Sequence, residues 1–433
     1  MALGPWVTTG VYDVPLIDFH CQAVLTNTAP TSPYRGAGRP EAVFIMERLM
    51  SEAARQTGID ETELRRRNLI RRDQMPYRNP MGQTYDDGDF DSILSQGLAL
   101  SDWAGFDARA AESAAGARLR GRGIATFLEW TGGPQLEEMV QVRVISGEDT
   151  VEIISATMPM GQGIATSYVQ LAIDEFGLAP EHIRIVQGDT DRANGFGSAA
   201  SRSLFTGGGA VQVASRRTVD DAKALAAEAL EVGVKDIEYA QGRYSIVGTD
   251  RSIGLFELAA RQSGGEIRNQ ASAKADAASW PNACHVAEVE IDPATGAVQV
   301  VAYSSVNDIG RVINPLIATG QVEGGALQGI GQALHEAVHY DPQDGQLLSA
   351  SLMDYTLPRA DESLTFRTAF DQSVPCKTNR LGAKGVGELG TIGATPAVVN
   401  AVVDALARAG RHGARQLQMP LTSEKVWLAL QRS

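Results

Sequence analysis

The stretch TVEIISATMPMGQGIATSYVQLAIDEFGLAPEHIRIVQGDT, residues 150–190, decides the class of fold. Its first residues are apolar and β-branched, as in a buried strand, and the glycines of MPMGQG then interrupt the pattern. A helical segment and a second strand follow. The order of strand, glycine turn, helix and strand is typical of an α/β unit.

A second stretch repeats this order further along the chain. HVAEVEIDPATGAVQVVAYSSVNDIG, residues 285–310, is typical of paired strands, and GQVEGGALQGIGQALHEAV, residues 320–338, follows it. Residues 217–240 are rich in Ala, Glu and Lys and predict a further amphipathic helix. We therefore expect a mixed α+β fold of two similar α/β subdomains.

The N-terminal part and the end of the chain predict further elements. Residues 1–30 alternate apolar and polar side chains, which predicts strands. A helix is expected from Pro40 to Gly58, with proline at its first turn and glycine at its end. Shorter helices are expected over residues 60–70 and 395–410.

Composition narrows the classes of function. Against 52 acidic residues the 433-residue chain has 38 Lys and Arg, a net charge of −14 that argues against nucleic acid as a partner. We find no apolar run of about 18 residues and expect no membrane span and a cytoplasmic location. Cys21, Cys284 and Cys376 form no C-x-x-C motif, so we expect neither an iron–sulfur cluster nor structural zinc within the chain.

Four glycine-rich segments are candidates for ligand contact. They are TSPYRGAGRPE (31–41), MPMGQGIATS (158–167), GFGSAASRSLFTGGGAVQVAS (195–215) and IATGQVEGGALQGIGQAL (317–334). Glycine lets a backbone approach a ligand closely, and amides at a helix N-terminus suit phosphate or another polar acceptor. Taken singly, each segment could also be a tight turn or a site of close helix packing.

One carboxylate stands out within NRLGAKGVGELGTIGATP, residues 379–396. Glu388 lies between glycine and leucine, and its neighbours Val386, Leu389 and Ile392 are apolar. Apolar surroundings favour the neutral form of a carboxyl and suit a general base. The alternative is a carboxylate that begins the helix after it.

Together these motifs resemble the molybdenum hydroxylases of the xanthine oxidase family. YRGAGRPEA, MGQG, GDT…SRS…GGGAV, GQVEGGALQGIGQAL and KGVGELG occur in the family's order, most similar to large subunits of the aerobic carbon monoxide dehydrogenase type. The resemblance implies an α+β subunit whose two subdomains grip molybdopterin cytosine dinucleotide. It also implies that the molybdenum has no direct protein ligand.

The resemblance assigns roles to individual residues. It makes Glu388 the general base and places Arg35 beside the substrate. The expected cofactor contacts are Gly161, Gln162, Gly163, Ser198, Ser201, Arg202, Ser203, Thr206, Gly209, Ala210, Gln321, Lys384, Gly385, Val386 and Gly387. The expected substrate-pocket residues are Tyr34, Ala37, Phe127, Glu129 and Trp130, the last three of which could instead belong to the core.

The implied reaction inserts a water-derived oxygen at an electron-poor carbon of an N-heterocycle. Electrons would pass to 2Fe-2S clusters and FAD on partner subunits. An aldehyde oxidase or dehydrogenase of the same family, or a non-catalytic molybdopterin-binding or assembly protein, are the alternatives. Glu388 and Arg35 argue against a non-catalytic binder.

Two departures from the family pattern concern the substrate. Carbon monoxide dehydrogenases proper carry a copper-holding cysteine in the loop that here reads YRGAGR, and no cysteine lies between Thr31 and Pro40. We therefore expect no oxidation of carbon monoxide. Xanthine-oxidising members carry phenylalanine where Ala37 stands, so the resemblance does not imply purine geometry.

The resemblance also predicts how the chain is divided. Residues 1–115 would be the remainder of a first molybdopterin-binding domain with a connector, and residues 116–433 a second one with subdomains 116–275 and 276–433. An upstream half with a GGGFG loop is expected from the family and has no counterpart here. The chain would then be either a naturally split subunit or a fragment, and in both cases we expect a second chain that carries this half to complete the site.

Overall fold

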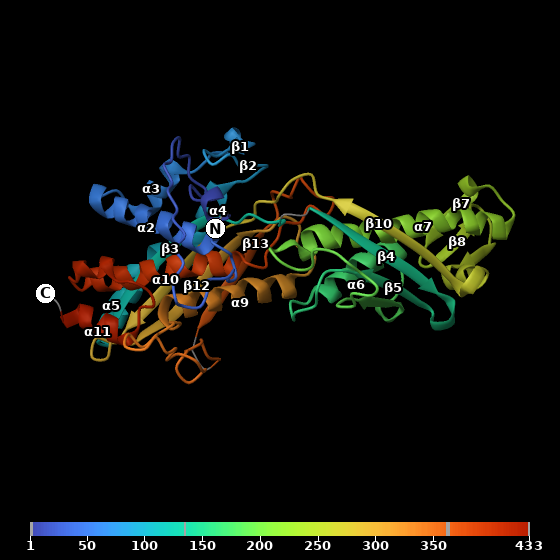
Figure 1. Ribbon diagram of the computed structural model, residues 1–433. Coiled ribbons are helices and arrows are strands. Elements are labelled where there is room, and N and C mark those ends of the chain that lie inside the picture. The colour runs from blue at the N-terminus through green and yellow to red at the C-terminus, as the bar shows by residue number, and fades with distance from the viewer. Residues whose placement is uncertain (1–2, 134–135, 361–363, 432–433) are drawn as a thin grey trace.

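The computed structural model describes residues 3–133, 136–360 and 364–431. Two lobes lie end to end and give the molecule an elongated shape (Figure 1). Each lobe is built on one four-stranded sheet, with strand orders β13-β12-β11-β3 and β10-β4-β5-β6. Mixed helix and sheet in two subdomains is the fold that the sequence predicts.

The first lobe contains β3 (Leu119–Leu128), β11 (Asn282–Ile291), β12 (Val298–Asp308) and β13 (Thr365–Asp371). β11 pairs antiparallel with both β3 and β12, and β12 pairs parallel with β13. A parallel pair needs a crossover connection, and helix α9 (Pro315–Leu334) lies within it.

The second lobe contains β4 (Glu137–Ile145), β5 (Thr150–Ser155), β6 (Ile183–Val186) and β10 (Glu266–Lys274). β4 pairs antiparallel with β10 and β5, and β5 pairs parallel with β6. Helix α6 (Ile164–Phe176) forms the crossover between the parallel strands.

The two sheets therefore repeat one topology: two antiparallel pairings, then one parallel pairing with a helical crossover. This repeat confirms the two similar subdomains expected from the sequence. The expected subdomain 116–275 contributes its first strand, β3, to the sheet of the other lobe, where it pairs with β11. Pairing across the sheet, rather than position along the chain, decides where this strand lies.

Helices α9 and α10 (Leu389–Arg408) pack against each other beside the first sheet. A Cβ at Gly390 would lie 2.1 Å from the carbonyl oxygen of Val322, and a Cβ at Gly329 would lie 2.7 Å from the Cβ of Ala394. The glycines of residues 317–334 thus belong to a helix and allow close packing. Close helix packing, one of the alternatives for that segment, therefore accounts for these glycines, and Gln321 of the same helix still lines the cavity described below.

Other helix boundaries differ from the sequence prediction. α10 begins at Leu389 and not near residue 395, because the helix continues through Pro396. α7 spans Gly209–Leu230, and residues Ile237–Ala240 form strand β7, so the helix predicted over 217–240 is shifted. Helices α2 (Arg39–Thr57) and α3 (Glu61–Asn68) confirm the two predicted near the N-terminus.

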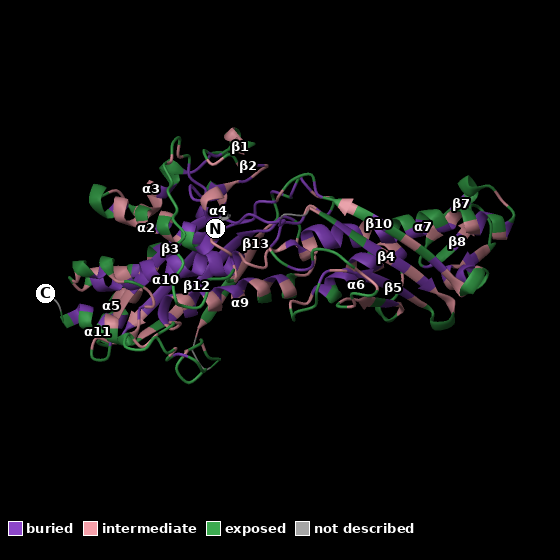
Figure 2. Cartoon of the chain, in the orientation of Figure 1, coloured by how far each residue is buried: buried purple, intermediate pink, exposed green. Residues whose placement is uncertain are grey.

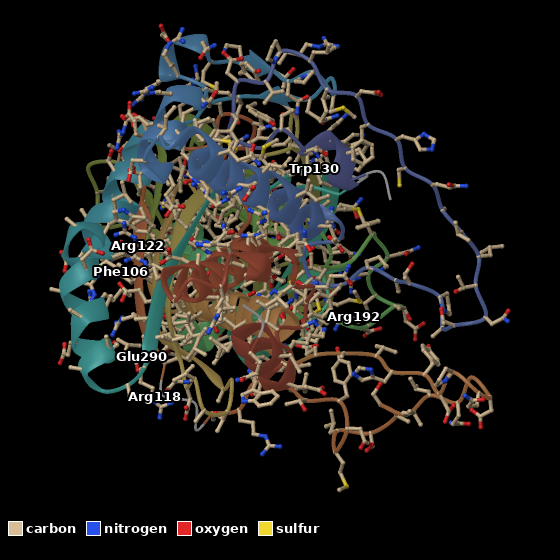
Figure 3. All side chains as sticks on the ribbon, turned by 90° about the vertical axis from the view of Figure 1, so that its left-hand side faces the viewer. Phe106, Arg118, Arg122, Trp130, Arg192 and Glu290 are labelled. Carbon is tan, nitrogen blue, oxygen red and sulfur yellow. The ribbon has the colours of Figure 1, made fainter. Side chains whose placement is uncertain are left out.

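The strands predicted for residues 1–30 are not formed over residues 3–30, and residues 1–2 lie outside the described part of the chain. Leu3–Trp6 is helix α1, and residues 16–33 pair with no strand in the described part of the chain. A strand needs a neighbour for its backbone hydrogen bonds, and here the backbone amide of Ala29 donates to the hydroxyl of Tyr340 at 3.0 Å. In Figure 3 this blue segment runs away from the body of the molecule.

The remaining elements lie around the two sheets. They are β1 (Tyr77–Arg78), β2 (Thr84–Tyr85), α4 (Phe90–Leu100), α5 (Phe106–Ala115), β8 (Arg243–Ile246), β9 (Ser252–Gly254), α8 (Leu255–Ala260) and α11 (Ser423–Gln431).

The core runs along α10 and the first sheet and continues between α7 and the second sheet (Figure 2). By length and composition α10 could cross a membrane, which the sequence reading had not recognised. However, 89% of its apolar window is buried inside the protein, as in the core helix of a folded domain.

Candidate functional site

A cavity of about 550 Å³ lies where segments of the two lobes meet. Its walls come from the loop before α2, the loop before α6, residues 198–204, the connection from β12 into α9, and the loop before α10. The glycine-rich segments of both lobes therefore converge on one space.

The cavity brings together many of the predicted site residues. It is lined by Arg35, Gly161, Gln162, Ser198, Ser201, Ser203, Gln321, Lys384, Gly385, Val386, Gly387 and Glu388. Sequence reasoning did not assign several further lining residues, among them Ser167, Arg311, Asn314 and Gln328. Asn314 caps α9 by accepting a hydrogen bond from the backbone amide of Ile317.

The remaining predicted residues lie outside the lining. Arg202 is fully buried and forms an ion pair with Glu138 at 2.7 Å. The predicted residues that are not part of the lining are Tyr34, Ala37, Gly163, Thr206, Gly209, Ala210, Phe127, Glu129 and Trp130.

Two of the predicted pocket residues have structural contacts instead. Phe127 belongs to the core of the first lobe and packs edge-on against His285. Trp130, labelled in Figure 3, packs edge-on against Trp6 with 5.5 Å between ring centroids.

Glu388 precedes α10, and its carboxylate is held by polar groups. The backbone amide of Gly36 donates to Oε1 at 3.0 Å, and Nη2 of the buried Arg39 lies 2.7 Å from Oε2. Oγ of Ser201 lies 3.0 Å from the same oxygen. The apolar surroundings expected for this carboxylate are therefore wrong, because two distant segments, the loop into α2 and the turn at Ser201, fold three donors around it.

Arg35 links the opening loop to two other walls. Its Nη1 donates to Oε1 of Gln328 at 2.8 Å, and its Nη2 donates to Oε1 of Gln321 at 3.0 Å. Its Nε donates to the carbonyl oxygen of Gly387. Burial lowers the pKa of Arg35 from its ordinary value, with Glu129 and Glu388 opposing that shift. This arginine fixes the relative positions of the loop, α9 and the segment before α10.

Sequence reasoning missed Arg39. Its guanidinium is fully buried, contacts Glu388 and donates from Nε to the carbonyl oxygen of Gly36 at 2.5 Å. The available signal was a second arginine four residues after Arg35 in a glycine-rich loop. A lone arginine at a helix start does not reveal a carboxylate more than 300 residues away.

The glycines before Glu388 allow Ser201 to approach. A Cβ at Gly385 would lie 2.6 Å from the carbonyl oxygen of Ser201 and 2.3 Å from Cγ2 of Thr131. Ala200 and Ser201 have positive φ angles of 50° and 54°, an uncommon conformation for residues other than glycine. This strained turn sets the Ser201 hydroxyl against Glu388.

A buried ion pair supports the same wall. Nζ of Lys384 lies 2.6 Å from Oδ2 of Asp308, and both side chains are almost fully buried. Burial raises the pKa of Asp308, and the Lys384 ammonium opposes the shift. The pair joins the end of β12 to the segment that carries Glu388.

The donors in the cavity fit an organic group better than a bare metal ion. No cluster of three His, Cys, Asp or Glu side chains that could hold a metal occurs among residues 3–133, 136–360 and 364–431. The walls instead offer amide and hydroxyl side chains and the N-terminus of α6. Such groups suit a pterin with a phosphate-bearing tail.

Comparison with known proteins agrees with this geometry. Two models of the molybdopterin cofactor-binding domain match the chain, over residues 3–69 and 96–364. The chain is 33% identical to the gamma subunit of the 6-hydroxypseudooxynicotine dehydrogenase complex of Paenarthrobacter nicotinovorans, over 97% of this chain and 54% of that one. It is 34% identical to the carbon monoxide dehydrogenase large chain of Hydrogenophaga pseudoflava, over 98% and 55%.

A solved structure shows the same fold. Quinoline 2-oxidoreductase from Pseudomonas putida 86 superimposes with a TM-score of 0.88 and 31% identity, over 99% of this chain and 56% of that chain. The chain thus spans about half the length of these relatives. It belongs to the molybdopterin cofactor-binding proteins of the xanthine oxidase family, as its motifs predict.

Proposed function

We propose that this chain forms the catalytic part of a molybdenum-dependent hydroxylase that acts on an N-heterocycle. The observation that carries the proposal is the Glu388 carboxylate, which lies in the cavity wall and is held there by Gly36 and Arg39. Two relatives support the substrate class: one is named for quinoline, a nitrogen heterocycle, and the other for 6-hydroxypseudooxynicotine.

We propose that the cavity holds molybdopterin cytosine dinucleotide. When bound, this cofactor supplies the redox chemistry that oxidises an electron-poor carbon with oxygen from water. Gln162, Gln321 and the backbone from Lys384 to Gly387 would hold the pterin. Ser198 and Ser203, before α7, would contact the dinucleotide.

Glu388 would act as the general base of this reaction. Its two oxygens have different partners, the Gly36 amide on Oε1 and Arg39 with Ser201 on Oε2. These contacts fix the carboxylate plane, which a base needs in order to accept a proton from one direction. Arg35 would keep the base and the wall formed by α9 at a constant separation and orient the substrate.

Carbon monoxide is not the substrate under this proposal. Gly36 occupies the centre of the opening loop with a φ of 104°, and a Cβ there would lie 2.4 Å from Cγ of Pro40. The loop backbone therefore suits glycine, and a cysteine at this position would force it to move.

We propose that polypeptide outside residues 1–433, on a second chain, completes the cavity. Residues 16–33 support this because the segment exposes several apolar side chains, with Leu16, Val24 and Leu25 at 83%, 70% and 101% exposure. Residues 1–115 and 116–433 would be the two molybdopterin-binding domains; the two family matches, over residues 3–69 and 96–364, support two domains, and the second match begins before residue 116.

Electron transfer defines the other partners. We propose that a 2Fe-2S subunit and an FAD subunit receive the electrons in a cytoplasmic complex. The names of the relatives, a subunit gamma of a complex and a large chain, support a multi-subunit assembly.

The test is Glu388→Gln in the assembled complex. Loss of a general base lowers turnover by ~10²–10⁴-fold, and molybdenum content should stay near that of the wild type. Glu323→Gln is the control, because Glu323 is an α9 acid that accepts a hydrogen bond from Thr368 outside the cavity lining. Turnover of Glu388→Gln within about threefold of the wild type, well short of that loss, would remove Glu388 from the reaction.

A further inference from the structure

Glu129 is a buried carboxyl that the cavity does not use. It follows strand β3, has no exposed surface and does not line the cavity. Its Oε1 lies 2.7 Å from Oγ of Ser201 and 3.9 Å from Nη1 of Arg39. Its Oε2 has no hydrogen-bond partner within the described structure. A buried carboxyl with an oxygen left over calls for a physical explanation.

Ser201 stands between two carboxyl groups. Its Oγ is 2.7 Å from Oε1 of Glu129 and 3.0 Å from Oε2 of Glu388. The backbone amide of Glu388 also donates to this oxygen at 3.1 Å. A serine hydroxyl has one proton and two lone pairs, so it donates to one carboxyl at a time.

The hydrogen bonds balance when Glu129 carries a proton. The Glu129 carboxyl then donates to Ser201 Oγ, which also accepts from the Glu388 amide and donates its own proton to the Glu388 carboxylate. Both lone pairs of Ser201 Oγ and its hydroxyl proton then take part in hydrogen bonds. If Glu129 is ionised, two carboxylates compete for one hydroxyl proton and one lone pair is left empty.

The surroundings of Glu129 favour the protonated form. Burial raises the pKa of Glu129 to about 8, and the charge of Glu388 adds to that shift. Arg39 from α2, the Ser201 hydrogen bond and Arg35 from the opening loop oppose it. These are the charged groups that face this carboxyl.

We propose that Glu129 is a positioning residue that sets the direction of the Ser201 hydrogen bond and so keeps a donor on the Glu388 carboxylate. This inference rests on the proposed role of Glu388 as base. The strained φ angles at Ala200 and Ser201 give independent support, because such strain persists where the structure holds a group in a required place.

The arrangement predicts an alkaline limit to activity. As pH rises through the pKa of Glu129, the carboxyl loses its proton and the Ser201 hydroxyl turns toward it. The Glu388 carboxylate then loses one donor and gains a negative neighbour. Turnover should fall above about pH 8 for this reason.

Two substitutions at Glu129 separate positioning from packing. Glu129→Gln keeps a donor toward Ser201 and has no proton to lose, so turnover at pH 7 stays within about threefold of the wild type and the alkaline decline disappears. Glu129→Met fills similar space but removes the hydrogen bond to the Ser201 hydroxyl, a bond between two neutral groups, so turnover at pH 7 falls by about three- to tenfold. Glu288→Gln, a buried acid paired with Arg109 and Arg120, is the control with an unchanged profile.

A second measurement uses the 433-residue chain without turnover. Infrared titration should show a protonated carboxyl that ionises near pH 8, absent in Glu129→Gln and present in Glu288→Gln. The proposal is overturned if a carboxyl band that ionises near pH 8 persists in Glu129→Gln, if no such band appears in the wild type, or if the alkaline decline is unchanged in Glu129→Gln. If Glu129→Met does not fold, the Gln variant and the infrared band decide alone. Failure of the base hypothesis would appear separately, in Glu388→Gln.

Discussion

Gly385→Ala tests whether packing within the chain requires glycine in the segment before Glu388. The new Cβ would lie 2.3 Å from Cγ2 of Thr131 and 2.6 Å from the carbonyl oxygen of Ser201. Carbon atoms in contact prefer about 3.5–4.0 Å, so the segment has to move by more than about 1 Å. One of the two obstructing groups is backbone, which no rotamer change can relieve.

The size of the effect follows from that overlap. Overpacking of this kind costs about 1–3 kcal/mol, and we expect the upper part of that range. The displacement also separates Glu388 from Ser201, and a misplacement of about 1 Å in a reacting constellation can lower turnover by ~10²-fold. Stability and activity should therefore fall together.

Gly387→Ala is the matched control in the same segment. Its Cβ would lie 3.3 Å from Oγ of Ser201, the end of a side chain that can adjust, and should cost less than about 1 kcal/mol. Urea denaturation of each chain measures the free energy of unfolding, and turnover of the assembled complex measures the second effect. Equal stability of wild type and Gly385→Ala would refute the reasoning.

Three other predictions concern stability. In α9, Gly320→Ala meets open space and should stabilise by about 0.5–1 kcal/mol, whereas Gly329→Ala meets α10 and should destabilise by about 1–3 kcal/mol in urea denaturation. Arg202→Met leaves Glu138 buried without its partner and should lower the free energy of unfolding by about 3–5 kcal/mol in urea denaturation. This loss should not depend on how much cofactor the protein contains. Burial lowers the pKa of His285 to about 4. The buried neutral imidazole therefore stabilises the fold fully above about pH 6.5, and this contribution is lost as pH falls toward 4. The urea midpoint of His285→Gln should vary less between pH 6.5 and pH 4 than that of the wild type.

Local pattern was sufficient for most individual elements. The helix from Arg39 to Thr57 has a proline near its start and Gly58 directly after its end, and both residues are visible in the sequence. In the structure Gly58 adopts the left-handed conformation that ends the helix. The order of strand, glycine turn, helix and strand occurs twice in the sequence and predicted two similar subdomains. Each occurrence corresponds to one pair of parallel strands joined by a helix. The strands predicted for residues 1–30 were wrong because alternation of side chains does not supply a partner strand.

The candidate site shows where local pattern stops being informative. Arg35 and Glu388 were identified by residue type and by glycines beside them, and both line the cavity. Glu129 and Arg202 were assigned to ligand contact, although Glu129 is buried against Ser201 and Arg202 is buried in an ion pair with Glu138. Burial depends on which segments pack above a residue, and its sequence neighbours do not show that.

The sequence by itself determined the family, the α/β units and the loops that surround the cavity, because motif order and periodicity are properties of consecutive residues. The tertiary structure alone decided the partners of Glu388. Gly36 comes from the loop before α2 and Arg39 from the start of α2, which packs against α10, and Ser201 comes from the segment before α7. All three lie more than 180 residues away from Glu388 along the chain. Hydrogen bonds extend about 3 Å, so such a set of contacts exists only once distant parts of the chain are brought together.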